Sequence, residues 1–231
     1  MKTVTNASIE ERNDFAQKIY GIVGLQVLVT AIMCFFAINS KTFLAILCQP
    51  AILVLSLIGI VVISIMFCCS KEMRSTVPRN YILLLLFTLC EGSSVATICG
   101  FADPEAVALA GVLTGGVFLV LTGYAITTKE DYTIAWRIIL TLAIASLFLG
   151  IVRIFYNTDM MELLACFIGI ITSCFYILYD TQLIFGGHQR QFELDDYILA
   201  ALNIYLDLVI LFVKILKFIS EAKGKKKKEN E

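Results

Sequence analysis

Charged residues are scarce in this chain. They make up 16% of its 231 residues, whereas hydrophobic residues make up 59%. A soluble domain carries about 25% charged residues, so this chain has too few to cover a surface that faces water. Histidine occurs only once, at His188 in a polar loop, and we assign it no role.

A secretory signal peptide is also lacking. Residues 1–18 are polar and of mixed charge, with no apolar core and no small-residue cleavage site. We therefore expect residues 1–18 to form a cytosolic tail. The first apolar segment would then act as its own uncleaved anchor.

Long apolar runs, by contrast, recur along the chain. A run of about 20 residues is long enough to cross a bilayer core of about 30 Å. The runs lack the two-residue alternation of a membrane barrel, so helices are expected. Seven such segments, with short connections that leave no room for a soluble domain, lie at residues 19–38, 51–69, 81–101, 106–126, 137–156, 161–185 and 198–218. The sequence predicts an all-α, polytopic membrane protein with a seven-helix bundle over residues 19–218 and a basic tail at 219–231.

The distribution of Lys and Arg predicts the orientation. The N-terminal tail and the second, fourth and sixth connections hold nine of them, whereas the other connections offer only Lys41 and, near a helix end, Arg153. Since the excess marks the cytosolic side, we expect a cytosolic N-terminus. Seven more lysines lie between Lys214 and Lys228, and seven full crossings would place them on the opposite side. A last segment that enters the membrane and returns therefore stays open as an alternative.

Glycines gather in the fourth segment. Gly111 and Gly115 form a small-xxx-small pair, which lets helix backbones approach closely. We expect this pair to pack helices within the bundle, and an interface between two copies of the chain is the alternative.

Three acidic residues, Glu91, Asp180 and Asp207, lie well inside apolar segments. An acid in hydrocarbon costs about 2.5 kcal/mol or more and usually faces the interior of a bundle. At a rise of about 1.5 Å per residue, Asp180 lies about 8 Å and Asp207 about 14 Å from the same membrane face. The two aspartates are on consecutive antiparallel segments, so we expect them to meet.

Polar residues accompany both aspartates at helical spacing. Tyr176 shares a face with Asp180, and Asn203 shares a face with Asp207. Two carboxyl groups in contact tend to share one proton. Such a pair can sense pH, bind a hard cation such as Ca²⁺, or act as the acid–base pair of an aspartyl protease. A clasp that only holds two helices together is a further alternative, and the residues alone leave these possibilities open.

Several separated motifs resemble one family. The segment Tyr179–Gln182 (YDTQ) and the segment Asp195–Asp207 (DDYILAALNIYLD) resemble the C-terminal signature of the transmembrane BAX inhibitor motif family, specifically its lifeguard branch. Residues 15–30 and 77–91 are similar to the beginnings of the first and third spans of that branch. The resemblance covers nearly the whole chain.

The resemblance implies a membrane protein of the ER or Golgi that suppresses cell death and lowers Ca²⁺ in internal stores through a slow, pH-sensitive leak. It also implies that Asp180 and Asp207 form a proton-sharing pair that gates the path and meets Ca²⁺. Arg74 matches an arginine that competes for this pair as a latch. Bacterial relatives carry an acid in the second span, which residues 51–69 lack, so Glu91 is the candidate replacement. With Asn203 and Tyr176, Glu91 would complete a polar ion path.

Other functions fit the sequence less well. An intramembrane aspartyl protease needs Gly-x-Gly-Asp at its second aspartate, and Asp207 follows Ile-Tyr-Leu instead. The motifs of a seven-helix receptor are absent. A non-conducting scaffold that binds death-pathway membrane proteins stays open. We expect no enzymatic activity, no cofactor and no nucleic-acid partner. The expected partners are the lipid bilayer, Ca²⁺ and membrane proteins of the death pathway.

Overall fold

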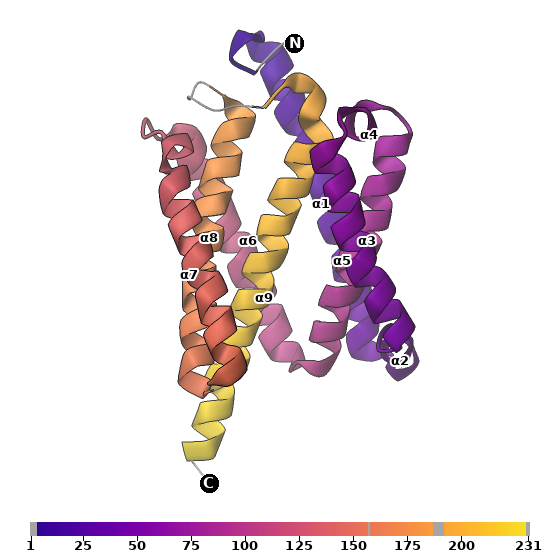
Figure 1. Ribbon diagram of the computed structural model, residues 1–231, viewed down its shortest axis with the longest axis vertical. Helices are drawn as coiled ribbons and strands as arrows, with labels where there is room; N and C mark the ends of the chain where they lie inside the picture. The colour runs from indigo at the N-terminus through magenta and orange to yellow at the C-terminus, as the bar shows by residue number, and fades with distance from the viewer. Residues whose placement is uncertain (1–3, 157, 187–191, 230–231) are drawn as a thin grey trace. The chain divides into compact units, whose positions relative to one another are not determined.

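The computed structural model describes residues 4–156, 158–186 and 192–229, and the elements of these residues are all helical (Figure 1). Seven helices are long and apolar enough to cross a membrane, which confirms the predicted fold class. They are α1 (Ile9–Asn39), α3 (Pro50–Cys69), α5 (Arg79–Phe101), α6 (Pro104–Thr127), α7 (Trp136–Phe155), α8 (Asp159–Phe185) and α9 (Tyr197–Glu229). His188 lies outside the described residues.

Serine caps explain the early start of α1 and two short helices that the sequence did not predict. Helix α1 begins well before its apolar run because Ser8 and Glu11 form a capping box. Ser8 N donates to Glu11 Oε2 at 2.8 Å, and Glu11 N donates to Ser8 Oγ at 3.2 Å. Two short helices, α2 (Lys41–Leu47) and α4 (Lys71–Ser75), begin in the same way after Ser40 and Ser70. The described residues also form three 3₁₀ turns: η1 (Val4–Asn6), η2 (Tyr132–Ala135) and η3 (Leu194–Asp196).

The last segment is one continuous helix. Helix α9 runs for 33 residues from Tyr197 to Glu229, a length of about 50 Å. A segment that enters the membrane and returns needs a turn, and α9 has none. The re-entrant alternative therefore disagrees with the structure, and the lysines of the tail extend the same helix.

The chain divides into two compact units, and α9 contributes to both. Unit 1 contains Met1–Pro104 and Phe192–Tyr205, and unit 2 contains Glu105–Gln191 and Leu206–Glu231. In unit 1, α5 packs against both α1 and α3. In unit 2, α7 packs against α8, and η2 contacts both of these helices.

Glycine allows a close approach in unit 1. A Cβ atom on Gly100 of α5 would lie 2.5 Å from Leu44 Cδ1 and 3.3 Å from the backbone oxygen of Ala37. The missing side chain thus makes room for α2 and for the end of α1. The glycines of α6 differ, because no atom lies within 4 Å of a Cβ on Gly111 or Gly115. Both the expected packing of these two glycines within the bundle and the interface between two copies therefore stay predictions.

An ion pair holds α4 to the segment that precedes α9. Lys71 Nζ donates to Glu193 Oε2 at 2.6 Å. This hydrogen bond lowers the pKa of the Glu193 carboxyl from its ordinary value. The pair therefore stabilises unit 1 only while the carboxyl is ionised.

The first prediction concerns Gly100. Gly100→Leu should lower the free energy of unfolding by about 1–3 kcal/mol, because the new side chain must displace Leu44 and the backbone at Ala37. Gly111→Leu is the matched control and should leave this free energy nearly unchanged, since the space around Gly111 is open. Denaturant unfolding in detergent micelles measures both values. Equal losses in the two variants would contradict the packing described for α2 and α5.

The second prediction concerns Lys71. Because the folded pKa of Glu193 lies below its unfolded value of about 4.3, the pair contributes stability above that value. The contribution is lost as the pH falls through the folded pKa. Lys71→Met should therefore unfold at a lower temperature than the wild type at about pH 6, and the two should converge at about pH 3. Thermal unfolding followed by circular dichroism tests this, with Lys41→Met as the control. A difference that persists unchanged at the lower pH would refute the assignment.

Candidate functional site

Asp180 and Asp207 lie together inside unit 2. Asp180 is in α8 and Asp207 is in α9, and their side chains are buried, with 5% and 7% of their surface exposed. A hydrogen bond joins the two side chains. The structure thus brings together the two acids that depth along the helices predicted to meet.

A hydrogen bond between two carboxyl groups requires a proton. Carboxylate oxygens only accept, so one of the two groups must be protonated to donate. Asp207 Oδ2 is a buried oxygen with no hydrogen-bond partner within the described part of the chain. The pair therefore holds at least one proton, which the two carboxyl groups share.

Of the two polar neighbours predicted for the pair, Tyr176 belongs to the same unit as both aspartates and Asn203 does not. Tyr176, one turn before Asp180 in α8, lies close enough to interact electrostatically with both aspartates. Asn203 is partly buried one turn before Asp207, on the same side of α9. Asn203 belongs to unit 1 and Asp207 to unit 2, so only their shared helix relates them.

Gln182 fixes the end of α8 near Asp180, and the sequence did not identify this role. Its side chain is 1% exposed. Its Nε2 donates to the backbone oxygen of Glu130 at 2.8 Å, and its Oε1 accepts from Tyr132 N at 2.7 Å. These bonds satisfy backbone groups of the α6–α7 connection and hold it against α8. The feature of the sequence that could have indicated this role is the position of the polar Gln182 two residues after Asp180, near the end of an apolar segment.

A second polar cluster lies within unit 1. Tyr205 of α9 shares a hydrogen bond of 2.7 Å with Thr30 of α1, and Gln26 Nε2 donates to Thr88 Oγ1 of α5 at 3.0 Å. These four side chains are at most 7% exposed. Glu91 of α5 lies close enough to interact electrostatically with Tyr205. Helical spacing could have identified the cluster, because Gln26 and Thr30 are four residues apart on one face.

Arg74 forms its own ion pair in unit 1. Its Nε donates to Asp196 Oδ1 at 2.7 Å, and its Nη1 donates to the backbone oxygen of Phe67 at 3.1 Å. The Arg74 and Asp196 side chains are only 17% and 11% exposed. Arg79 instead forms an exposed contact of 3.3 Å with Glu72. Arg74 and the Asp180–Asp207 pair belong to different units, so the role of Arg74 as a latch stays a prediction.

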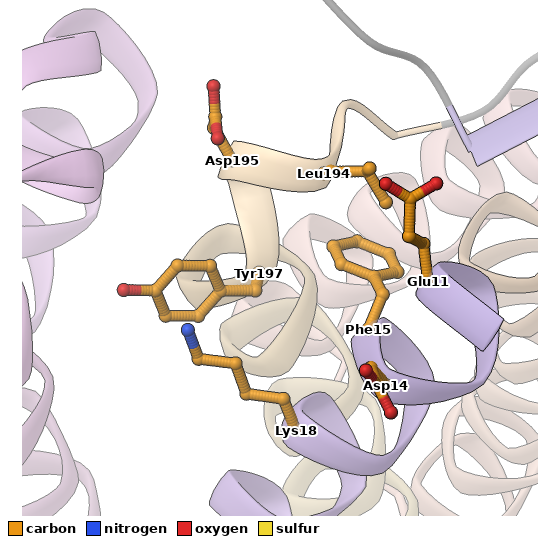
Figure 2. Close-up of a pocket in the computed structure, with 7 residues that line it drawn as sticks. All are labelled: Glu11, Asp14, Phe15, Lys18, Leu194, Asp195 and Tyr197. Atoms are coloured by element: carbon orange, nitrogen blue, oxygen red, sulfur yellow. The ribbon is translucent and has the colours of Figure 1, made fainter. Parts of the chain in front are cut away.

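A cavity of about 320 Å³ opens at the end of unit 1 where α1 and α9 begin (Figure 2). Lys18 Nζ lies 3.3 Å from the centre of the Tyr197 ring, a cation–π contact. Figure 2 shows that Asp195 points away from this lysine. The lining residues are Glu11, Asp14, Phe15, Lys18, Leu194, Asp195 and Tyr197. None of the residues predicted for the ion path is among them.

Metal coordination was tested against the described residues. They contain no group of three or more His, Cys, Asp or Glu side chains arranged to hold a metal ion. Ca²⁺ takes six to eight oxygen ligands in a tight site. The two carboxyl groups of Asp180 and Asp207 alone therefore do not form a complete Ca²⁺ site.

Comparisons with known proteins cover almost the entire chain. Residues 12–224 match the family described as "Inhibitor of apoptosis-promoting Bax1". Protein lifeguard 4 of Mus musculus is 32% identical, over 96% of this chain and 91% of that protein. Protein lifeguard 3 of Homo sapiens is 30% identical, over 91% of this chain and 69% of that protein. The Golgi anti-apoptotic protein of Vaccinia virus (strain Lister) is 30% identical, over 97% of this chain and 92% of that protein.

The family match includes residues from all seven spanning helices, Asp180 and Asp207 among them. The chain belongs to the Bax inhibitor-1-like family of membrane proteins, with lifeguard proteins among its relatives.

Proposed function

We propose that this chain is an anti-apoptotic protein of internal membranes that lowers stored Ca²⁺ through a slow, pH-sensitive leak. The observation that carries the proposal is the hydrogen bond between Asp180 and Asp207, which needs a proton inside a membrane-spanning region. The relatives named for anti-apoptotic action and for the Golgi support the cellular part of the proposal. No catalytic step is included.

The shared proton supplies the pH sensitivity. When it leaves, two buried carboxylates face each other, and their repulsion is strong because few charges or water molecules screen it. The pair must then separate or attract a cation. Either response breaks the contact between α8 and α9 at the pair and favours an open path.

The small number of oxygen ligands at the pair supports passage of Ca²⁺ and not its tight binding. Two carboxylates attract Ca²⁺ through hard oxygen ligands. They supply too few oxygens to retain the ion, so water must complete its shell and the ion can leave again. Tyr176 lies close enough to act electrostatically on both carboxyl groups, which supports a role in adjusting how readily the pair loses its proton.

The third prediction tests the pair. Asp207→Asn keeps an uncharged hydrogen-bond donor beside Asp180 and imitates the protonated state. We expect Ca²⁺ efflux from proteoliposomes to be slow at every pH, about tenfold below the wild type at the pH where the wild type leaks fastest. A change of about 1.4 kcal/mol between closed and open states gives such a factor. Asp180→Asn should also lose the pH response.

Asp159→Asn is the matched control for these variants, because it changes an acid in the exposed first turn of the same helix, α8. It should leak like the wild type. If Asp180→Asn and Asp207→Asn both follow the wild-type pH profile, the gating role is wrong. A wild-type protein that conducts no Ca²⁺ would favour the non-conducting scaffold. Variants that lose stability but keep the wild-type pH response would favour a pair that only holds the two helices together.

The fourth prediction tests Arg74 as the latch. Arg74→Gln should speed efflux at acidic pH, where the wild type is closed. The reason is that the positive charge of Arg74 is proposed to stabilise the closed state, and the glutamine lacks that charge. Arg79→Gln is the matched control and should change nothing, since its contact with Glu72 is exposed. Asp196→Asn then separates two routes. An effect like that of Arg74→Gln would mean that Arg74 acts through Asp196, and the opposite effect would mean that a released Arg74 acts on the aspartate pair. Wild-type efflux in Arg74→Gln would remove the latch.

A further inference from the structure

Four charged side chains lie near enough to Cys166 in unit 2 to act on its thiol, and none belongs to the aspartate pair. Cys166 of α8 is 1% exposed. Arg153 of α7, Glu162 of α8, and Lys214 and Lys217 of α9 all act electrostatically on its thiol. Three helices therefore bring these charges to one place.

This basic cluster (Arg153, Lys214 and Lys217) has too few acids. Glu162 is the one carboxylate among the four charges and is already paired, with Arg153 Nη2 at 2.6 Å from its Oε2. Among the charged groups that act on the Cys166 thiol, three cations therefore face one carboxylate. Arg153 Nε is a buried donor with no acceptor in the described part of the chain. Neither Lys214 nor Lys217 makes a hydrogen bond or an ion pair with any described residue.

The cluster extends well inside the spanning helices. A Cβ atom on Gly169 of α8 would lie 2.8 Å from Lys214 Cε, so the lysine stem fills the space that this glycine leaves. Gly169 is ten residues from the start of α8, which is about 15 Å along the helix. Lys217 is one turn nearer the end of α9. A cation at such depth is costly unless an anion or water reaches it.

We propose that Arg153, Lys214 and Lys217 bind the phosphate group of an anionic phospholipid. Phosphate oxygens would accept from the orphaned Arg153 Nε and from the two ammonium groups, which removes the charge excess. Basic pockets between spanning helices typically bind such head groups. Long lysine stems let the charges reach the interface while their carbons stay in the apolar region.

The surrounding surface favours a lipid over free phosphate. Ile154 and Phe155, next to Arg153 on α7, are 78% and 76% exposed, and Phe218, next to Lys217 on α9, is 37% exposed. Apolar side chains flank the cations on both helices and offer a surface for acyl chains. Inorganic phosphate would gain nothing from these contacts.

The test is retention of lipid by the full chain after purification in mild detergent. Native mass spectrometry would count bound phosphatidylglycerol and phosphatidylcholine after incubation with equal amounts of both. The wild type should retain phosphatidylglycerol preferentially. Lys214→Gln combined with Lys217→Gln should weaken this retention about 30-fold, at the typical contribution of one lysine near an anionic surface. Lys223→Gln is the matched control on α9, because Lys223 is exposed and faces Glu105 at 3.5 Å.

A second variant separates binding from misfolding. Glu162→Gln removes the single carboxylate and releases Arg153, so it should strengthen retention of phosphatidylglycerol, which a merely destabilised protein could not do. Excess inorganic phosphate should not displace the lipid, and equal displacement would identify free phosphate as the ligand. Unchanged retention in the double lysine variant, or no preference over phosphatidylcholine in the wild type, would overturn the proposal.

Discussion

Hydrocarbon offers no hydrogen-bond partner, so a polar side chain on a spanning helix must find its partner within the chain. This constraint explains where the helices of each unit are tied together. In unit 1, Gln26 bonds to Thr88 and Thr30 bonds to Tyr205. In unit 2, Asp180 bonds to Asp207, and Gln182 bonds to the backbone of the α6–α7 connection. Each bond joins two different elements of the chain, so the polar residues help to specify which elements meet while the apolar surface faces lipid.

The spanning helices could be predicted because their signal is local. Apolar length alone located all seven. It missed the early start of α1 at Ser8 and the short helices α2 and α4 after Ser40 and Ser70, because these begin through side-chain bonds that hydropathy does not register. It also missed the continuation of α9 beyond residue 218 to Glu229. The continuity of α9 could not be predicted in the same way. Lysines at its end suggested a segment that turns back, whereas turning requires a break in the backbone that no glycine or proline provides between Tyr197 and Gly224.

The aspartate pair was predictable from depth, since consecutive antiparallel helices bring residues of similar depth together. The ion pair between Arg74 and Asp196 could not be predicted in this way, because Asp196 lies in a short turn whose position depends on how unit 1 folds. The basic cluster was missed for a different reason. Arg153, Lys214 and Lys217 are spread over 65 sequence positions and were interpreted as signals of orientation. Only the packing of α8 against α7 and α9 around Cys166 brings them together.

The two charged groups of unit 2 lie on one side of α9. Lys214 follows Asp207 by seven residues, which is two turns or about 10.5 Å. The stem of Lys214 fills the space that Gly169 leaves, so its ammonium group lies near Gly169 and not beside the pair. Gly169 precedes Asp180 by eleven residues, which is about 16 Å along α8. Because no cation of the described part of the chain therefore lies beside the two carboxyl groups on this face, their shared proton is what limits the charge at the pair.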